Sequence, residues 1–142
     1  MAEKVLLVDD EKEFVEGLAE RMELRGMNVD TCTNPEKALD MVNGDSYDAI
    51  ILDLQMPGVD GIEVLKHIKK SNPDMQVILL SGHATVEKGI EAMKLGAMDF
   101  VEKPADINVL TEKIKKAQAR KMILVEKKAE DKMKDIIGKK GW

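Results

Sequence analysis

The chain has 142 residues, of which 44% are hydrophobic and 35% are charged, with a formal net charge of -5 at pH 7. This length favours one domain that buries a core, and the composition excludes a disordered chain. The apolar runs stop after four or five residues, far short of the roughly 20 that cross a bilayer, so the sequence argues against a membrane protein.

Short apolar runs recur along the chain and predict five β-strands. Three of them are continuously apolar rather than alternating, which is typical of central parallel strands covered on both faces. The segment after Gly26 has the weakest strand pattern. The predicted strands are Val5–Val8, Asn28–Thr31, Ala49–Leu52, Val77–Leu80 and Phe100–Glu102.

Amphipathic stretches follow the strands and predict five helices, because their apolar residues recur every three or four positions. In the first, the apolar positions are Phe14, Val15, Leu18, Met22 and Leu24. Strands that alternate with helices in this way predict an α/β fold with a parallel sheet and helices on both faces. The predicted helices run from about Glu11 to Arg25, from Asn34-Pro35 to about Asn43-Gly44, through Ile62, Leu65 and Ile68 to Asn72-Pro73, through Val86, Ile90, Met93 and Leu95 to Gly96, and from Asp106 onward.

Polar residues stand at the carboxyl ends of four predicted strands: Asp9-Asp10, Asp53, Ser81 and Lys103. In open α/β sheets these ends meet at one edge, where ligands bind. Adjacent carboxylates repel each other unless a cation neutralises them. Mg²⁺ prefers oxygen ligands and often combines one or two carboxylates with a phosphate, so the pattern predicts a magnesium site.

Asp53 is the strongest candidate for covalent chemistry, because it ends an apolar run and precedes a turn that exposes it at the sheet edge. A carboxylate in this position can attack phosphorus, provided that charge on the transferred group is neutralised. We expect Lys103 to pair with Asp53 at rest and with a phosphoryl oxygen afterwards, and Ser81 to donate a hydrogen bond to another oxygen. The sequence therefore makes Asp53 a candidate for forming an aspartyl phosphate.

The segment from Lys4 to about Ala119 resembles the receiver domain of bacterial two-component response regulators. The resemblance implies a flavodoxin-like, doubly wound, five-stranded parallel sheet of order 2-1-3-4-5 with five helices, and a cis peptide before Pro104. The stretch from Ser81 to Pro104 is similar to receivers of nitrogen-regulation-type transcriptional activators. The residues that carry the resemblance are Asp9-Asp10, Asp53 with Met56-Pro57-Gly58 and Asp60-Gly61, Ser81-Gly82, and Phe100 three positions before Lys103-Pro104.

The resemblance also implies a reaction. Asp53 would accept a phosphoryl group from a sensor histidine kinase in phosphorelay signalling, and the protein would assist its own phosphorylation and dephosphorylation without being an enzyme in its own right. The cofactor Mg²⁺ would be bound by Asp10, Asp53 and the main-chain carbonyl of Gln55, with Asp9 acting through water. Lys103 would neutralise the phosphoryl group.

The signal is expected to leave the site through a change of packing. Ser81 and Phe100 match the switch positions of receivers, and the face made by helix four, strand five and helix five would change shape. Gln55 and His83 match the positions that control water access and phosphoryl lifetime. A lone loop histidine is more often a surface residue than a phosphorelay group, so we interpret His83 as a surface residue.

The C-terminal part of the chain differs in charge and pattern. Residues 106–142 carry 11 basic and 6 acidic side chains, whereas residues 1–105 carry 11 and 21. The helix from Asp106 is expected to continue beyond the domain, giving a receiver at 1–119 and a basic helical extension or linker at 120–142. Its apolar stripe suits either a coiled coil, including one with a second copy, or a solvated linker helix. The stripe is formed by Met122, Val125, Ala129, Met133 and Ile136.

The remaining expectations concern partners and competing functions. The output is either a separate protein or an output domain missing from this chain, and a homodimer could use the helix 4, strand 5 and helix 5 face or the C-terminal helix. The absence of a helix-turn-helix, an aromatic platform and an arginine cluster argues against direct nucleic-acid binding. Without a signal peptide after Met1, a cytoplasmic location is expected.

Two other functions stay open. A phosphatase with an aspartyl nucleophile would want a second aspartate two residues after Asp53, where Gln55 stands. An inert pseudo-receiver that acts only as an interaction module would be expected to have lost an acidic or lysine position. The single cysteine, Cys32, has no cysteine partner and is interpreted as a packing residue at a strand end.

Overall fold

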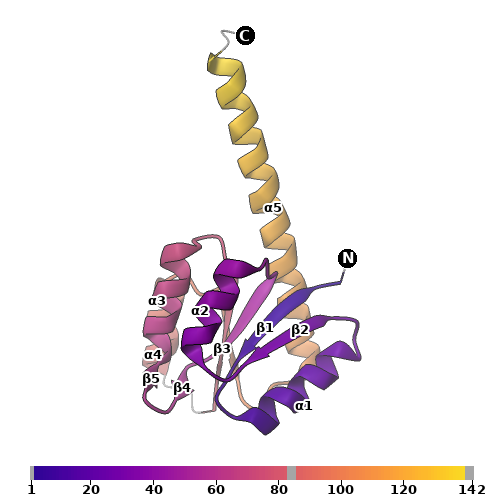
Figure 1. The fold of residues 1–142 in the computed structure, drawn as a ribbon, viewed down its shortest axis with the longest axis vertical. Helices are drawn as coiled ribbons and strands as arrows, with labels where there is room; N and C mark the ends of the chain where they lie inside the picture. The colour runs from indigo at the N-terminus through magenta and orange to yellow at the C-terminus, as the bar shows by residue number, and fades with distance from the viewer. Residues whose placement is uncertain (1, 83–85, 140–142) are drawn as a thin grey trace.

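A computed structural model describes residues 2–82 and 86–139 and has a parallel sheet at its centre (Figure 1). The strand order is β2-β1-β3-β6-β7. This is the predicted order 2-1-3-4-5 once the two-residue strands β4 and β5 are set aside, so the flavodoxin-like fold is confirmed. The five strands of this sheet are β1 (Lys4–Val8), β2 (Asn28–Cys32), β3 (Ala49–Asp53), β6 (Val77–Ser81) and β7 (Asp99–Glu102).

The two faces of the sheet bury separate hydrophobic clusters, because successive side chains of a strand point to opposite faces. On one face, Leu6, Ile50 and Leu79 pack with residues of three helices, α2 (Pro35–Gly44), α3 (Gly61–Ser71) and α4 (Val86–Lys94). On the other face, neighbouring strand residues pack against α1 (Lys12–Glu23) and α5 (Ile107–Lys139). The three continuously apolar strands are β1, β3 and β6, and they occupy the centre of the sheet as expected.

Most helix boundaries follow their local signals. Asn34 accepts a hydrogen bond from the main-chain N–H of Glu36 at the start of α2, and Asp106 accepts one from Asn108 at the start of α5. Gly26 adopts a φ of 87°, which favours glycine, just after α1. These interactions satisfy main-chain groups that a helix leaves unpaired at its ends.

Three apolar residues do not pack where the helical pattern suggested. Leu24 follows the last turn of α1 and is 88% exposed, and Ile90 and Met93 on α4 are 52% and 45% exposed. Among residues 87–94 of α4, the side chain that is buried is that of Ala92. A helix on an open sheet covers it with a limited stripe, so apolar side chains at the margins of that stripe stay in solvent.

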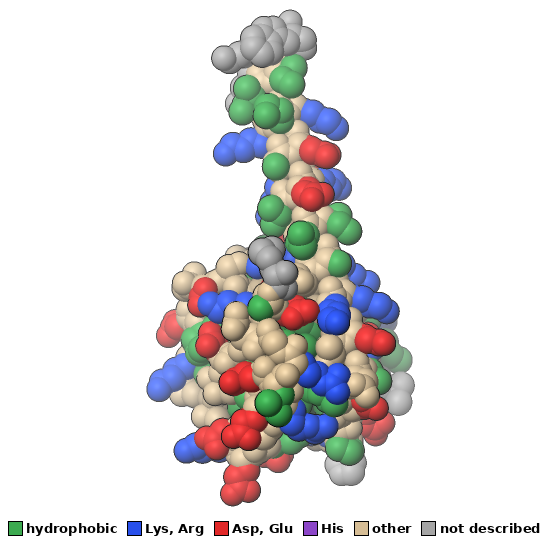
Figure 2. All heavy atoms as spheres, turned by 90° about the vertical axis from the view of Figure 1, so that its right-hand side faces the viewer, with side chains coloured by type: hydrophobic (Ala, Val, Ile, Leu, Met, Phe, Trp, Pro, Cys, Tyr) green, Lys and Arg blue, Asp and Glu red, His purple; other side chains and the backbone are tan. Residues whose placement is uncertain are grey.

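Helix α5 is continuous and passes well beyond the body of the domain (Figure 1). It begins near the carboxyl ends of the strands, lies against the sheet through Leu110, Ile114 and Ala117, and leaves past the opposite edge. The predicted apolar stripe is exposed on the protruding part, where Figure 2 shows hydrophobic side chains along the helix. None of the helices in the described part of the chain is long and apolar enough to span a membrane.

The turn after Asp53 forms a small antiparallel hairpin of β4 (Gln55–Met56) and β5 (Val59–Asp60), which the sequence predicted only as a turn. The start of α3 lies against the main chain of Asp53 and Leu54, just before this hairpin. A Cβ on Gly61 would lie 2.6 Å from the Cα of Leu54, so only glycine fits there without a shift of the backbone. This close approach fixes the main chain next to Asp53.

Candidate functional site

The carboxyl ends of the strands bring the predicted polar residues to one edge of the sheet. Asp9 and Asp10 follow β1, Asp53 ends β3, Ser81 ends β6 and Lys103 follows β7. Asp9, Asp53 and Ser81 are buried, with 3%, 2% and 2% of their surface exposed, whereas Asp10 is exposed. The convergence expected from the strand order is therefore found, and its acidic part is largely withdrawn from solvent.

Lys103 is the cation of this site. Its Nζ lies 2.8 Å from Asp9 Oδ2, 3.4 Å from Asp53 Oδ2 and 3.7 Å from Glu11 Oε1. The sequence predicted a resting pair with Asp53, and that pair is present, but the shorter contact is with Asp9. Asp9 directly follows β1 and Asp53 ends the neighbouring strand β3, so both carboxylates reach the ammonium group of Lys103.

The main chain holds both buried carboxylates and the lysine in place. Asp53 Oδ1 accepts a hydrogen bond of 3.0 Å from the N–H of Gln55, and Asp9 Oδ1 accepts one of 3.0 Å from Glu11. The N–H of Lys103 donates to the carbonyl of Ser81 at 2.7 Å, and the peptide between Lys103 and Pro104 is cis, as expected. Asp9 and Asp53 therefore each accept a main-chain hydrogen bond with Oδ1 and direct Oδ2 toward Lys103.

The environment makes Asp53 a weaker acid than usual. Burial, followed by the negative charge of Asp9, raises the pKa of Asp53 to about 6, against opposing contributions from the Gln55 N–H and Lys103. Burial and the adjacent Asp9 also raise the pKa of Asp10. Burial opposes the charged form of Lys103, but its hydrogen bond to Asp9 and the surrounding carboxylates raise the pKa overall.

The acidic residues also suit a hard cation. One carboxylate oxygen from each of Asp9, Asp10 and Asp53 lies within 4.8 Å of the others. An all-oxygen donor set favours Mg²⁺ over zinc or copper. Burial, together with the mutual repulsion of the carboxylates, raises the pKa of Asp10 and Asp53, and a divalent ion would relieve that repulsion. The donor chemistry therefore fits the predicted metal.

The other predicted site residues lie on β4, β6 and β7 or after β6. Ser81 is buried at the end of β6, and Phe100 is half-buried on β7, where its ring packs toward α4 next to Gly89. Gln55 lies on β4, directly beside the site. His83 lies outside the described residues. Cys32 is buried at the end of β2, as expected for a packing residue.

Two residues at the site were not singled out from the sequence. The carboxylate of Glu11 faces Lys103, and the ring of Phe14 lies under it, with Nζ 4.4 Å from the ring centroid. Phe14 stands in the first turn of α1, and helical side chains lean toward the helix N-terminus. The sequence could have indicated this contact, because a side chain in the first turn that leans toward the helix N-terminus points back to the sheet edge.

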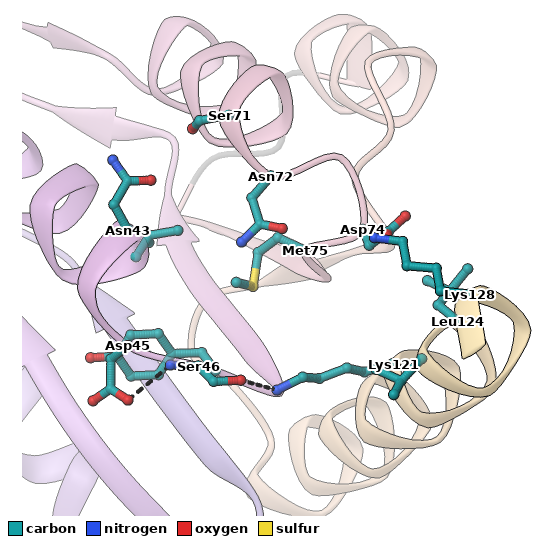
Figure 3. A pocket seen from close by; sticks show the side chains of 13 residues that line it. Asn43, Asp45, Ser46, Ser71, Asn72, Asp74, Met75, Lys121, Leu124 and Lys128 are labelled. Carbon is teal, nitrogen blue, oxygen red and sulfur yellow. Dashed lines mark hydrogen bonds and ion pairs between the residues drawn. The ribbon is translucent and has the colours of Figure 1, made fainter. Parts of the chain in front are cut away.

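A separate hollow of about 440 Å³ lies at the opposite edge of the sheet (Figure 3). It is bordered by the segments before β3 and β6 and by the protruding part of α5. Lys121 donates a 2.6 Å hydrogen bond to Ser46, and Lys128 pairs with Asp74. These contacts hold the extension beside the domain, remote from Asp53.

Residues 5–115 match the family model described as the response regulator receiver domain. The C4-dicarboxylate transport transcriptional regulatory protein DctD of Pseudomonas aeruginosa is 32% identical over 123 residues, which are 85% of this chain and 26% of DctD. A putative NtrX-like response regulator of Rickettsia felis is 37% identical over 115 residues, which are 80% of this chain and 24% of the relative. This chain thus spans about a quarter of the length of these curated relatives.

Solved structures agree with the sequence matches. A response regulator receiver domain protein from Clostridium thermocellum superposes with a TM-score of 0.82 at 35% identity, covering 87% of this chain and 99% of that one. NtrX from Brucella abortus has a TM-score of 0.82 at 30% identity, covering 91% of this chain and 29% of NtrX.

Proposed function

Because the chain belongs to the response regulator receiver domain family, we propose that Asp53 is its phosphoacceptor and that a sensor histidine kinase is the donor. The observation that carries the proposal is the buried Asp53 carboxylate facing the ammonium of Lys103 at 3.4 Å, beside two further aspartates. Such an arrangement supplies a nucleophile together with the neutralisation that phosphoryl transfer requires.

In the proposed step, a carboxylate oxygen of Asp53 attacks phosphorus while the bond from phosphorus to the imidazole nitrogen of a phosphohistidine breaks. The imidazole leaves with the electron pair, and Asp53 becomes an acyl phosphate. Lys103 then pairs with a phosphoryl oxygen, and the hydroxyl of Ser81 donates to another. Loss of the phosphoryl group reverses the charge change, since water attacks phosphorus and the Asp53 carboxylate leaves.

Mg²⁺ is the proposed cofactor, held by Asp10, Asp53 and the main-chain carbonyl of Gln55, with Asp9 acting through water. When bound, the ion would supply positive charge to the transferring phosphoryl oxygens. The three clustered carboxylates support this assignment. The chain itself shields Asp53 from solvent, keeps Lys103 in contact with Asp53 and holds the turn at Gln55 in place.

The proposed output is a change in the surface formed by α4, β7 and α5. Phosphorylation adds about two negative charges, and pairing of Ser81 with the phosphoryl group would bias the packing of Phe100. Exposed apolar side chains on this surface support a role in partner contacts. They are Ile90 and Met93 on α4 and Val109 on α5.

We also propose that residues 1–119 form the receiver and 120–142 a basic helical extension leading to an output domain or partner. The relatives' greater length supports an output domain. The proposed phosphorylation by a sensor kinase would take place in the cytoplasm.

The exposed stripe on α5 supports pairing with a second copy. Light scattering of the full chain and of a version ending at Ala119, with and without a phosphoryl mimic, tests this pairing. A monomer mass in every sample would contradict it.

The phosphoacceptor is tested by incubating the protein with Mg²⁺ and acetyl phosphate and weighing it intact. One phosphoryl adduct in the wild type and none in Asp53→Asn is the expected result. Continued phosphate release from many substrates would favour the phosphatase reading. An unmodified protein under every donor would favour an inert interaction module.

A further inference from the structure

We propose that Phe14 is a positioning residue for Lys103, acting through the face of its ring. This role depends on the proposed phosphorylation of Asp53 and adds an aromatic residue to the proposed site. The Nζ of Lys103 lies 4.4 Å from the centroid of the Phe14 ring, within the range of a cation–π contact. Phe14 is therefore in direct contact with the charge that the reaction uses.

The ring completes the surroundings of the ammonium group. Carboxylates of Asp9, Asp53 and Glu11 lie on the polar side of Lys103, at 2.8, 3.4 and 3.7 Å. The ring approaches the same atom from α1, and only 14% of the Lys103 side chain is exposed. An aromatic face attracts a cation without a fixed donor direction, so it can hold Lys103 while its carboxylate partners change.

The ring itself is held by the core. Phe14 is half-buried and packs against the hydrophobic cluster between the sheet and α1, to which Val15 and Leu18 also belong. The stem of Lys103 passes Gly82, which has no side chain to pack against it: an added Cβ there would lie 3.9 Å from Lys103 Cδ, at ordinary contact distance. The ring of Phe14 can therefore fix the position of the Lys103 ammonium group, which the flexible lysine stem alone does not fix.

The expected effect follows from keeping water away from one side of the cation. Charge interactions strengthen as the local dielectric falls, so Lys103 neutralises a phosphoryl oxygen better beside a ring than beside water. Replacing Phe14 with leucine keeps apolar volume but removes the aromatic face. We expect the initial rate of Asp53 phosphorylation by acetyl phosphate, at saturating Mg²⁺, to fall about three- to tenfold.

The experiment compares wild type, Phe14→Leu, Phe14→Tyr and proteins with phenylalanine 14 fluorinated at one, two or three positions. The expected result is a rate that Phe14→Tyr retains and that falls stepwise with fluorination, since fluorine weakens the ring's negative face at similar shape. Val15→Ala is the matched control. It disturbs the same cluster without touching Lys103, and its rate is expected to stay within about twofold of wild type although its stability falls.

A second readout needs no phosphorylation. In the resting protein, the Phe14 ring should shift the NMR signals of the Lys103 Cε protons upfield, and Phe14→Leu should remove that shift. Equal rates in folded Phe14→Leu and wild type, or equal rates across the fluorinated series, would overturn the role of Phe14 alone. A wild type that takes up no phosphate would overturn the proposed function and this role with it.

Discussion

Lys103 places its Nζ 2.8 Å from Asp9 Oδ2, closer than the 3.4 Å that separates it from Asp53 Oδ2. The lysine therefore pairs first with the aspartate proposed to act through water and only second with the proposed phosphoacceptor. Burial and the charge of Asp9 raise the pKa of Asp53 despite the opposing charge of Lys103, so the ammonium group neutralises Asp53 only in part. Its charge remains available to a metal ion and to phosphorus.

Replacing Asp9 should make Asp53 more acidic. Asp9→Asn removes a charge that raises the pKa of Asp53 and frees Lys103 to pair with Asp53 alone, so the pKa should fall below about 6. The measurement is a pH titration of the Asp53 side-chain carbon by NMR in metal-free buffer. Asp40→Asn, a change at an exposed position on α2, is the control and should leave the pKa unchanged. A rise in Asp9→Asn would contradict the assigned cause.

Neutralising Asp53 should stabilise the metal-free protein above about pH 6. The folded-state pKa of about 6 exceeds the ordinary value of 3.8, so the folded state binds the proton more tightly. Ionisation of Asp53 thus costs stability as the pH rises from about 4 to 6. Asp53→Asn should unfold in urea with a free energy about 1 to 2 kcal/mol higher at pH 7.5, and this gain should vanish near pH 4. A gain independent of pH would show that another effect dominates.

Mg²⁺ should stabilise the folded protein through the acidic cluster. A ligand that binds only the folded state raises the melting temperature, and we expect a rise of about 2 to 5 °C in the wild type with millimolar Mg²⁺. Asp10→Asn should lose most of this rise, because the exposed Asp10 is a proposed direct ligand. Asp40→Asn should keep it, and potassium chloride at matched ionic strength should not reproduce it. An undiminished rise in Asp10→Asn would exclude Asp10 as a ligand.

The turn beside Asp53 should tolerate no side chain at position 61. A Cβ there would lie 2.6 Å from Leu54 Cα and 2.9 Å from its carbonyl oxygen. Gly61→Ala should therefore lower the free energy of unfolding by about 2 to 3 kcal/mol, measured in urea. Gly17→Ala is the matched control within α1, where nothing lies within 4 Å, and it should stabilise by up to about 1 kcal/mol. Similar effects of both changes would contradict the packing argument.

The strand pattern was sufficient to predict the sheet and most of the site. Continuous apolar runs identified β1, β3 and β6 as central, and their polar successors had to meet because parallel strands end at one edge. The exposed Ile90 and Met93 could not be predicted in this way. Helical spacing states which residues share a face, but the width of the covered stripe depends on neighbouring helices.

The finer geometry of the site depended on contacts between distant segments. Lys103 lies nearer to Asp9 than to Asp53 because of how these side chains extend from the ends of three strands. The spacing of residues in the sequence does not determine these distances. The ring of Phe14 and the carboxylate of Glu11 belong to the start of α1. Their contacts with Lys103 depend on the direction in which α1 leaves the sheet edge.

The most direct test of the central claim is to locate the phosphoryl group by chemistry. Protein treated with Mg²⁺ and acetyl phosphate is reduced with borohydride, which converts an aspartyl phosphate to homoserine, and its peptides are sequenced by mass spectrometry. We predict homoserine at position 53 alone, absent without the donor. Homoserine at another aspartate, or none in a protein that has gained phosphate, would contradict the assignment of Asp53 as the phosphoacceptor.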